Sequence, residues 1–125
     1  MMMLCLGVLS VPTGSAQISP APKSIPIEPS GKGDLRLLGG PPETVTMRSG
    51  CVILAPGKSV GKHSTRDNEE LLVILEGQGE MRIGEGTILR LNPKVIAYCP
   101  PRTEHDVFNT GTGPLRYIYV VAKAQ

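Results

Sequence analysis

The chain has 125 residues, a length that accommodates one domain. It carries 13 basic and 11 acidic residues, a balance too even to favour nucleic acid or an anionic membrane surface as a partner. With one Phe, three Tyr and no Trp, it also lacks the aromatic side chains on which single-stranded nucleic acid stacks.

The N-terminal segment has the pattern of a secretory signal peptide. A short apolar core is followed by small residues that end in Gly14-Ser15-Ala16, which suit cleavage after Ala16. The pattern departs from the usual one because the first basic residue is Lys23, and the apolar core is too short to span a membrane. We expect residues 1–16 to be a signal peptide and the protein to be exported to the periplasm or the medium. The alternative is a disordered apolar tail.

Residues 17–43 are predicted to be a linker or a loosely docked arm. Proline alternates there with small and polar residues, so the segment cannot bury enough surface to fold alone. A short strand can form at 34–39 before the Gly-Pro break that follows it.

Residues 44–123 are predicted to be one all-β domain. No stretch has a helical period of useful length, whereas β-branched runs recur between turn signals. The run 71–76 is apolar on both faces, which places it in the middle of a sandwich or barrel. About eight or nine short strands favour a β-sandwich or a barrel; besides a hairpin around residue 63, they are predicted at 34–39, 44–55, 71–76, 80–83, 87–91, 95–99, 104–109 and 115–122.

The cysteines allow several interpretations. If the signal peptide is removed, Cys5 leaves with it, and Cys51 and Cys99 remain. Both lie in apolar strand patterns, where a buried free cysteine is common, although an oxidising compartment also permits a disulfide between them. Cys99 as a metal ligand is a third alternative, because it lies near His105 in the sequence.

Two histidines and a glutamate form the candidate site. His63 precedes Thr65 by two residues, so on a strand both side chains project from the same face. The polar bend that follows can fold Glu70 back beside them, and the only other histidine is His105. Two imidazoles and a carboxylate carried on strands are enough to hold one divalent metal ion. The alternative is that both histidines are ordinary polar residues satisfied by backbone groups.

Glu70 is preferred to its neighbour Glu69 as the carboxylate. In a regular strand Glu70 shares a face with Leu72 and Ile74, whereas Glu69 faces the other side and is predicted to be solvated. The aromatic residues are interpreted as core and barrel wall: Tyr98, Phe108, Tyr117 and Tyr119.

These residues and their spacing resemble the cupin family. The first family motif is matched by Gly57, five residues, His63-Ser64-Thr65, four residues, Glu70, six residues and Gly77. In the second motif Pro100, His105 and Asn109 match, while Lys94 and Arg102 stand at the two glycine positions. The resemblance covers about residues 45–122 and implies a jelly-roll β-barrel.

The resemblance also implies the roles of the site residues. His63, Glu70 and His105 match three of the four family metal ligands, and Thr65 stands where a second histidine is usual. The implied cofactor is one divalent transition metal (Fe, Mn, Zn or Ni), with Thr65 bonded to a metal-bound water. Asn109 either lines the pocket or caps the turn that follows it.

Three classes of function follow from this interpretation. The first is a metal-dependent enzyme with dioxygenase-, hydrolase- or isomerase-like activity on a small polar substrate. The second is a module that binds a small molecule or a sugar without chemistry, which the loss of the second histidine favours. The third is a metal-free structural domain. The expected partners are a small molecule and, by resemblance, a second copy in a homodimer, with no nucleic acid and no membrane.

Overall fold

The structure is a computed structural model that describes residues 20–27 and 33–125. The predicted signal peptide, with Cys5, lies outside these residues. Among the described residues no helix is long and apolar enough to cross a membrane.

The described residues form nine β-strands and no helix, which confirms the all-β prediction. The strands are β1 (Leu35–Gly39), β2 (Arg48–Leu54), β3 (His63–Ser64), β4 (Asn68–Glu76), β5 (Gly79–Ile83), β6 (Thr87–Leu91), β7 (Ile96–Cys99), β8 (Glu104–Asn109) and β9 (Leu115–Lys123). The predicted strand 44–55 begins later, at Arg48, because the Thr44 hydroxyl donates to the Met47 carbonyl and closes a bend there.

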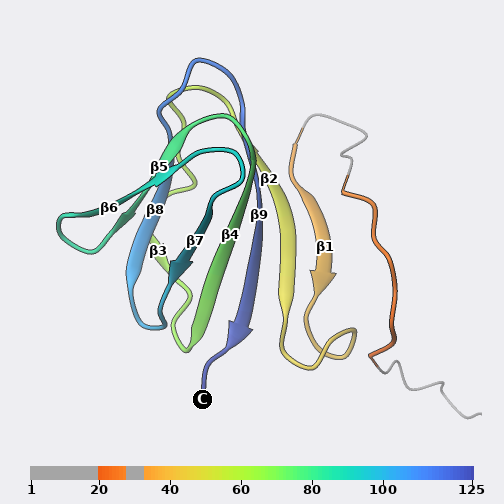
Figure 1. The fold of residues 1–125 in the computed structure, drawn as a ribbon. Helices are drawn as coiled ribbons and strands as arrows, with labels where there is room; N and C mark the ends of the chain where they lie inside the picture. The colour runs from red at the N-terminus through yellow and green to blue at the C-terminus, as the bar shows by residue number, and fades with distance from the viewer. Residues whose placement is uncertain (1–19, 28–32) are drawn as a thin grey trace, which may run out of the picture.

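The strands pair antiparallel in two sheets that face each other in a jelly-roll-like arrangement (Figure 1). One sheet has five strands in the order β1-β2-β9-β4-β7, and the other has four in the order β3-β8-β5-β6. The segment predicted as an arm therefore contributes one strand, β1, to the edge of the larger sheet.

The core lies between the two sheets and follows the period-2 alternation of the strands. In β4 the buried side chains are Glu70, Leu72 and Ile74, and the strand lies between β9 and β7, in the interior of its sheet as predicted. Across from it, Met81 of β5 and Val107 of β8 are buried in the same apolar cluster. Glu70 is thus the one charged group that β4 directs into the core.

The structure decides whether the two cysteines are bonded and whether Tyr98 of β7 belongs to the core. Cys51 and Cys99 are both buried and free, so they do not form the disulfide that was one of the alternatives. Tyr98 does not belong to the core, because Cys99 takes the inward position of β7 and turns its neighbour outward. The Tyr98 side chain is 52% exposed, and its hydroxyl donates to the carboxylate of Glu69.

Candidate metal centre

The pairing of β3 with β8 places the two histidines opposite each other. His63 and His105 are direct partners in the antiparallel register. Their ring centroids lie 4.4 Å apart, with an interplanar angle of 63°. Two residues separated by more than forty positions in the chain therefore present their imidazoles side by side.

Glu70 reaches the same point from the opposite sheet. Its Oε2 lies 2.6 Å from Nε2 of His105, and both side chains are buried. One ligand atom each from His63, Glu70 and His105 lies within 4.8 Å of the other two. We call these three residues the metal centre.

Backbone carbonyls determine which ring nitrogen each histidine presents. Nδ1 of His63 lies 2.7 Å from the Gly61 carbonyl, and Nδ1 of His105 lies 3.0 Å from the Thr103 carbonyl. Because a carbonyl oxygen can only accept, both Nδ1 atoms carry the proton. The Nε2 atoms are then the ones available as ligands, with the carbonyls holding each ring in place.

The surroundings of His105 favour its protonated form when no metal is bound. Burial by itself lowers the pKa of the imidazole, but the hydrogen bonds to Glu70 and Thr103 and the charge of Glu70 outweigh it, so the pKa is raised. Sγ of Cys99 also lies 3.3 Å from Nδ1 of His105, while burial raises the pKa of that thiol. Cys99 packs behind the ring and is not one of the three clustered ligands.

The loop before β3 is held by a residue that sequence reasoning missed. The buried Asp106 accepts a hydrogen bond from the Gly61 N–H at 3.0 Å, and the carbonyl of the same Gly61 orients His63. Asp106 follows His105 directly, so one strand supplies a ligand and the anchor for the loop of another. Its position beside a candidate histidine was the available signal, but the loop contact depends on tertiary structure.

Thr65 lies at the cavity, whereas Asn109 lies in the turns at the far end of β8. Thr65 lines the cavity over the metal centre, but its hydroxyl donates to the Asn68 carbonyl at 2.8 Å. Only oxygen lone pairs remain for a water in the cavity. Asn109 follows the turn-capping alternative: its amide nitrogen donates to the carbonyls of Leu54 and Gly113, and its oxygen accepts from Gly111.

The metal centre opens into a cavity of about 220 Å³ between the sheets. His63, Thr65 and Glu70 lie on its wall together with Tyr117 and Tyr119 of β9. No sequence motif singles out either tyrosine, although the alternation from Leu115 places both on the inward face.

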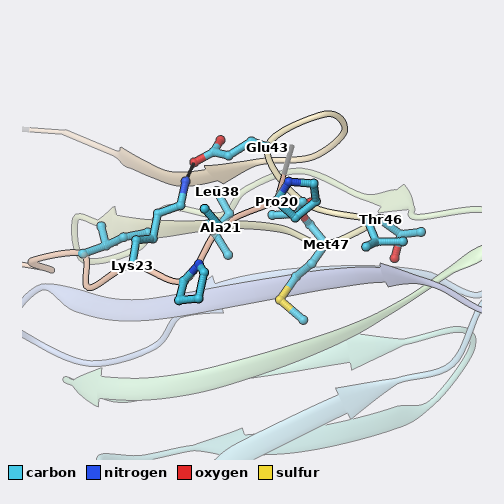
Figure 2. Close-up of a pocket in the computed structure, with 11 residues that line it drawn as sticks. Pro20, Ala21, Lys23, Leu38, Glu43, Thr46 and Met47 are labelled. Atoms are coloured by element: carbon cyan, nitrogen blue, oxygen red, sulfur yellow. Dashed lines mark hydrogen bonds and ion pairs between the residues drawn. The ribbon is translucent and has the colours of Figure 1, made fainter. Parts of the chain in front are cut away.

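A larger cavity, of about 540 Å³, lies away from the metal centre. It is bounded by the arm, residues 20–25, and by the loop around residues 43–47 (Figure 2). Figure 2 shows Lys23 reaching Glu43, and this ion pair measures 2.8 Å. The walls of this larger cavity are mainly apolar, and among the described residues it contains no cluster of metal-ligating groups. The smaller cavity is therefore the better candidate for chemistry.

The residues of the metal centre fit a divalent transition metal. Two neutral imidazole nitrogens and one carboxylate oxygen are a donor set that Fe, Mn, Zn and Ni accept. Both imidazoles have their second nitrogen hydrogen-bonded to a carbonyl, which is the usual support of a ligating histidine. An ion would take the place of the hydrogen bond between His105 and Glu70.

Comparisons with known proteins agree with this fold. A family model described as "Cupin domain" matches residues 50–121, more than half of the chain. No curated protein matches the chain.

Three solved structures illustrate the likeness in fold. The cupin domain of Cnp3 from Schizosaccharomyces pombe is 20% identical with a TM-score of 0.65, over 73% of this chain and 64% of that one. A Cupin 2 conserved barrel domain protein from Salinispora arenicola is 23% identical with a TM-score of 0.63, over 73% and 75%. A predicted oxalate decarboxylase from Thermotoga maritima is 18% identical with a TM-score of 0.60, over 80% and 100%. The match thus spans less than two thirds of the S. pombe chain.

Proposed function

The chain belongs to the cupin domain family, and we propose that it binds one divalent transition metal at its metal centre and uses the open positions of that metal to hold and activate a small molecule. The observation that carries this proposal is the convergence of His63, Glu70 and His105 from both sheets to within 4.8 Å of one another. The metal would be Fe, Mn, Zn or Ni.

Burial strengthens the argument for a metal rather than for an ordinary polar cluster. Glu70 and His105 are buried, and a buried carboxylate facing an imidazole is costly unless the pair is fully bonded. A cation bound between them would compensate the charge of Glu70. The Nδ1–H bonds of both histidines leave Nε2 as the nitrogen that the cation would bind, and at His105 the cation would replace the hydrogen bond to Glu70.

The metal would supply Lewis acidity at the inner end of the cavity, polarising a bound carbonyl or lowering the pKa of a bound water. The protein supplies three ligands, so positions remain for a water or a substrate. His63 is exposed and lines the cavity, whereas the His105 side chain is fully buried, so a small molecule would approach past His63. One structurally similar protein is named a predicted oxalate decarboxylase, but at 18% identity the likeness concerns the fold.

A module that binds a small molecule without chemistry is the second candidate. Apart from the ligands, the cavity wall offers no carboxylate, lysine or thiol that can act as a general acid or base among the described residues. The Thr65 hydroxyl is also engaged with Asn68. Turnover that depends on the metal would favour the enzyme over this module.

Metal analysis of the purified protein tests the proposal directly. We expect one equivalent of metal in the wild type and at least a tenfold loss of affinity in His63→Ala, His105→Ala and Glu70→Gln. Glu69→Gln is the matched control, because this neighbour lies on the opposite face of β4 and is exposed. Inductively coupled plasma mass spectrometry and calorimetric titration measure the two quantities. Full metal content in both histidine variants would refute the proposal.

A further inference from the structure

Valine forms most of the apolar wall of the cavity over the metal centre. Four of its nine lining residues are valines, namely Val52, Val60, Val107 and Val121. Among the described residues no lysine or arginine lines the cavity. A ligand that enters is therefore surrounded by methyl groups and has few polar partners.

One of those few partners is the hydroxyl of Tyr117. This tyrosine is 3% exposed and lines the cavity, and none of the hydrogen bonds between described residues involves its hydroxyl. Among the described residues the only fully enclosed side-chain nitrogen or oxygen without a hydrogen-bond partner is Nε of Arg116, so the Tyr117 hydroxyl keeps some contact with the space of the cavity. The hydroxyl of Tyr117 is thus a polar group directed at the cavity and available to its contents.

The charge around Tyr117 keeps it a donor. Burial first, and then the negative charge of Glu70, raise the pKa of the Tyr117 hydroxyl well above its usual range. The hydroxyl remains protonated at neutral pH and offers a proton to an acceptor. Among the charged groups that raise this pKa, Glu70 has the largest effect, ahead of Asp34 and Asp106, which links Tyr117 to the metal centre electrostatically.

The neighbouring Tyr119 differs in its packing. A Cβ placed on Gly50 would lie 2.7–2.9 Å from the edge and hydroxyl of the Tyr119 ring, so this ring lies across β2. In the sheet order β2 and β4 flank β9 on opposite sides, so Tyr119 leans away from the strand that carries Glu70. The Tyr119 hydroxyl is therefore packed over Gly50, and Tyr117 is the tyrosine whose hydroxyl we assign to the ligand.

We propose that Tyr117 donates a hydrogen bond to a small ligand bound at the metal centre, and that this ligand is neutral or singly negative with an apolar body. The inference rests on the proposed function and specifies its ligand. Tyr117 acts as a specificity-determining residue, because its hydroxyl would be the donor that meets an acceptor atom of the ligand beyond the metal.

The charge of the site selects against dianions. A divalent ion with Glu70 leaves one net positive charge, which a single negative charge on the ligand neutralises. A second negative charge would be buried against the valine wall without a cationic partner, and an unpaired buried charge is costly. Polyhydroxylated sugars are disfavoured for a related reason, since most of their hydroxyls would lose hydrogen bonds to water without replacement.

A protein loaded with Co²⁺ provides the test, because its visible d–d absorption reports ligands that enter the metal's coordination sphere. Isobutyrate, with one carboxylate and two methyl groups, is compared with malonate, which carries a second carboxylate in their place. We expect the wild type to bind isobutyrate at least tenfold more tightly than malonate. In Tyr117→Phe the affinity for isobutyrate should fall by about tenfold or more, the effect of losing a hydrogen bond to a charged acceptor. Tyr98→Phe, whose hydroxyl lies exposed on the outer face of the sheet and outside the cavity, should change it less than about threefold.

The outcomes separate this inference from the proposed function. Cobalt affinity should be equal in the wild type and in Tyr117→Phe, and similar melting temperatures would show that the variant is folded. If the wild type binds no cobalt, the proposed function fails first. If cobalt binds but Tyr117→Phe retains the wild-type affinity for isobutyrate, or if malonate is preferred, only the inference on Tyr117 and ligand charge is overturned.

Discussion

His63 and His105 each donate Nδ1–H to a carbonyl two residues earlier in the chain, Gly61 and Thr103 respectively. In extended backbone, residues two apart lie on the same face, so this bond is local and easily repeated. It occupies Nδ1 of both rings and leaves Nε2 as the candidate ligand atom, which at His105 meets Glu70. The two candidate ligand nitrogens are thus oriented without a metal, which would reduce the conformational entropy that metal binding must remove.

The raised pKa of His105 predicts a pH dependence for the metal-free protein. Protonated His105 is stabilised in the folded state, so its contribution to the free energy of unfolding is fully present below the unfolded pKa of about 6.5. The contribution is lost as the pH rises through the raised pKa of the folded state. Melting temperatures measured with a chelator between about pH 6 and 9 should therefore fall with rising pH.

Glu70→Gln is the comparison for this measurement. The variant removes the charge and the carboxylate acceptor that raise the pKa of His105, while it keeps the shape of the side chain. Its melting temperature should change less over the same pH range. An identical decrease in both proteins would show that Glu70 is not the cause.

At the scale of elements, β8 connects the site to the end of the fold. It begins with Glu104 and His105 at the metal centre and ends with Asn109 at the far loop. There the Asn109 side chain ties the end of β2 to the loop that precedes β9, through the carbonyls of Leu54 and Gly113. The same strand thus places a ligand and closes the turns that hold the sheets together.

Asn109→Ala should destabilise the protein without reducing its metal affinity. The variant loses three hydrogen bonds and leaves part-buried backbone groups without their side-chain partner, at a cost of about 1–3 kcal/mol in the free energy of unfolding. Urea denaturation and metal titration measure the two effects. Asn92→Ala, in an exposed turn, is the control and should be nearly neutral. If the variant kept its stability but bound metal more weakly, Asn109 would be a residue of the cavity rather than a cap of the turns.

At the scale of the whole molecule, the outer face of the five-stranded sheet carries a run of apolar side chains beside charged ones such as Glu69. Ile96 of β7 is 66% exposed beside Tyr98, and Leu71 and Val73 of β4 and Ile118 of β9 face the same side in register. Five strands about 4.8 Å apart and up to nine residues long span roughly 20 Å by 30 Å. That area is of the order of the 800 Å² that each partner of a stable complex buries.

We therefore expect a homodimer in which this face meets its copy about a two-fold axis. Light scattering coupled to gel filtration should give the mass of a dimer for the wild type and of a monomer for Ile96→Lys, since the lysine would be buried opposite its symmetry mate. Ile88→Lys is matched in chemistry and exposure, because Ile88 is 54% exposed on β6 of the other sheet. A monomeric wild type, or equal dissociation by both variants, would contradict this arrangement.

The sequence alone predicted most of the strands and the three residues of the candidate metal centre, although β2 begins at Arg48 rather than at 44 and β4 at Asn68 rather than at 71. Period-2 alternation depends on neighbouring residues, so strands such as Thr87–Leu91 and Glu104–Asn109 were predicted with their observed bounds. Family spacing identified His63, Glu70 and His105 as residues that belong together. It could not establish the side of β7 on which Tyr98 lies, because a short strand with mixed residues fits either register.

Only the tertiary structure decided what surrounds those three residues. The cross-strand pairing of β3 with β8, the role of Asn109 in the turns and the Tyr117 hydroxyl in the cavity all depend on distances between segments far apart in the chain. Local propensity carries no information about such distances. These distances are set when the two sheets pack around one core. The same packing brings the candidate ligands together and determines which side chains and charges line the cavity beside them.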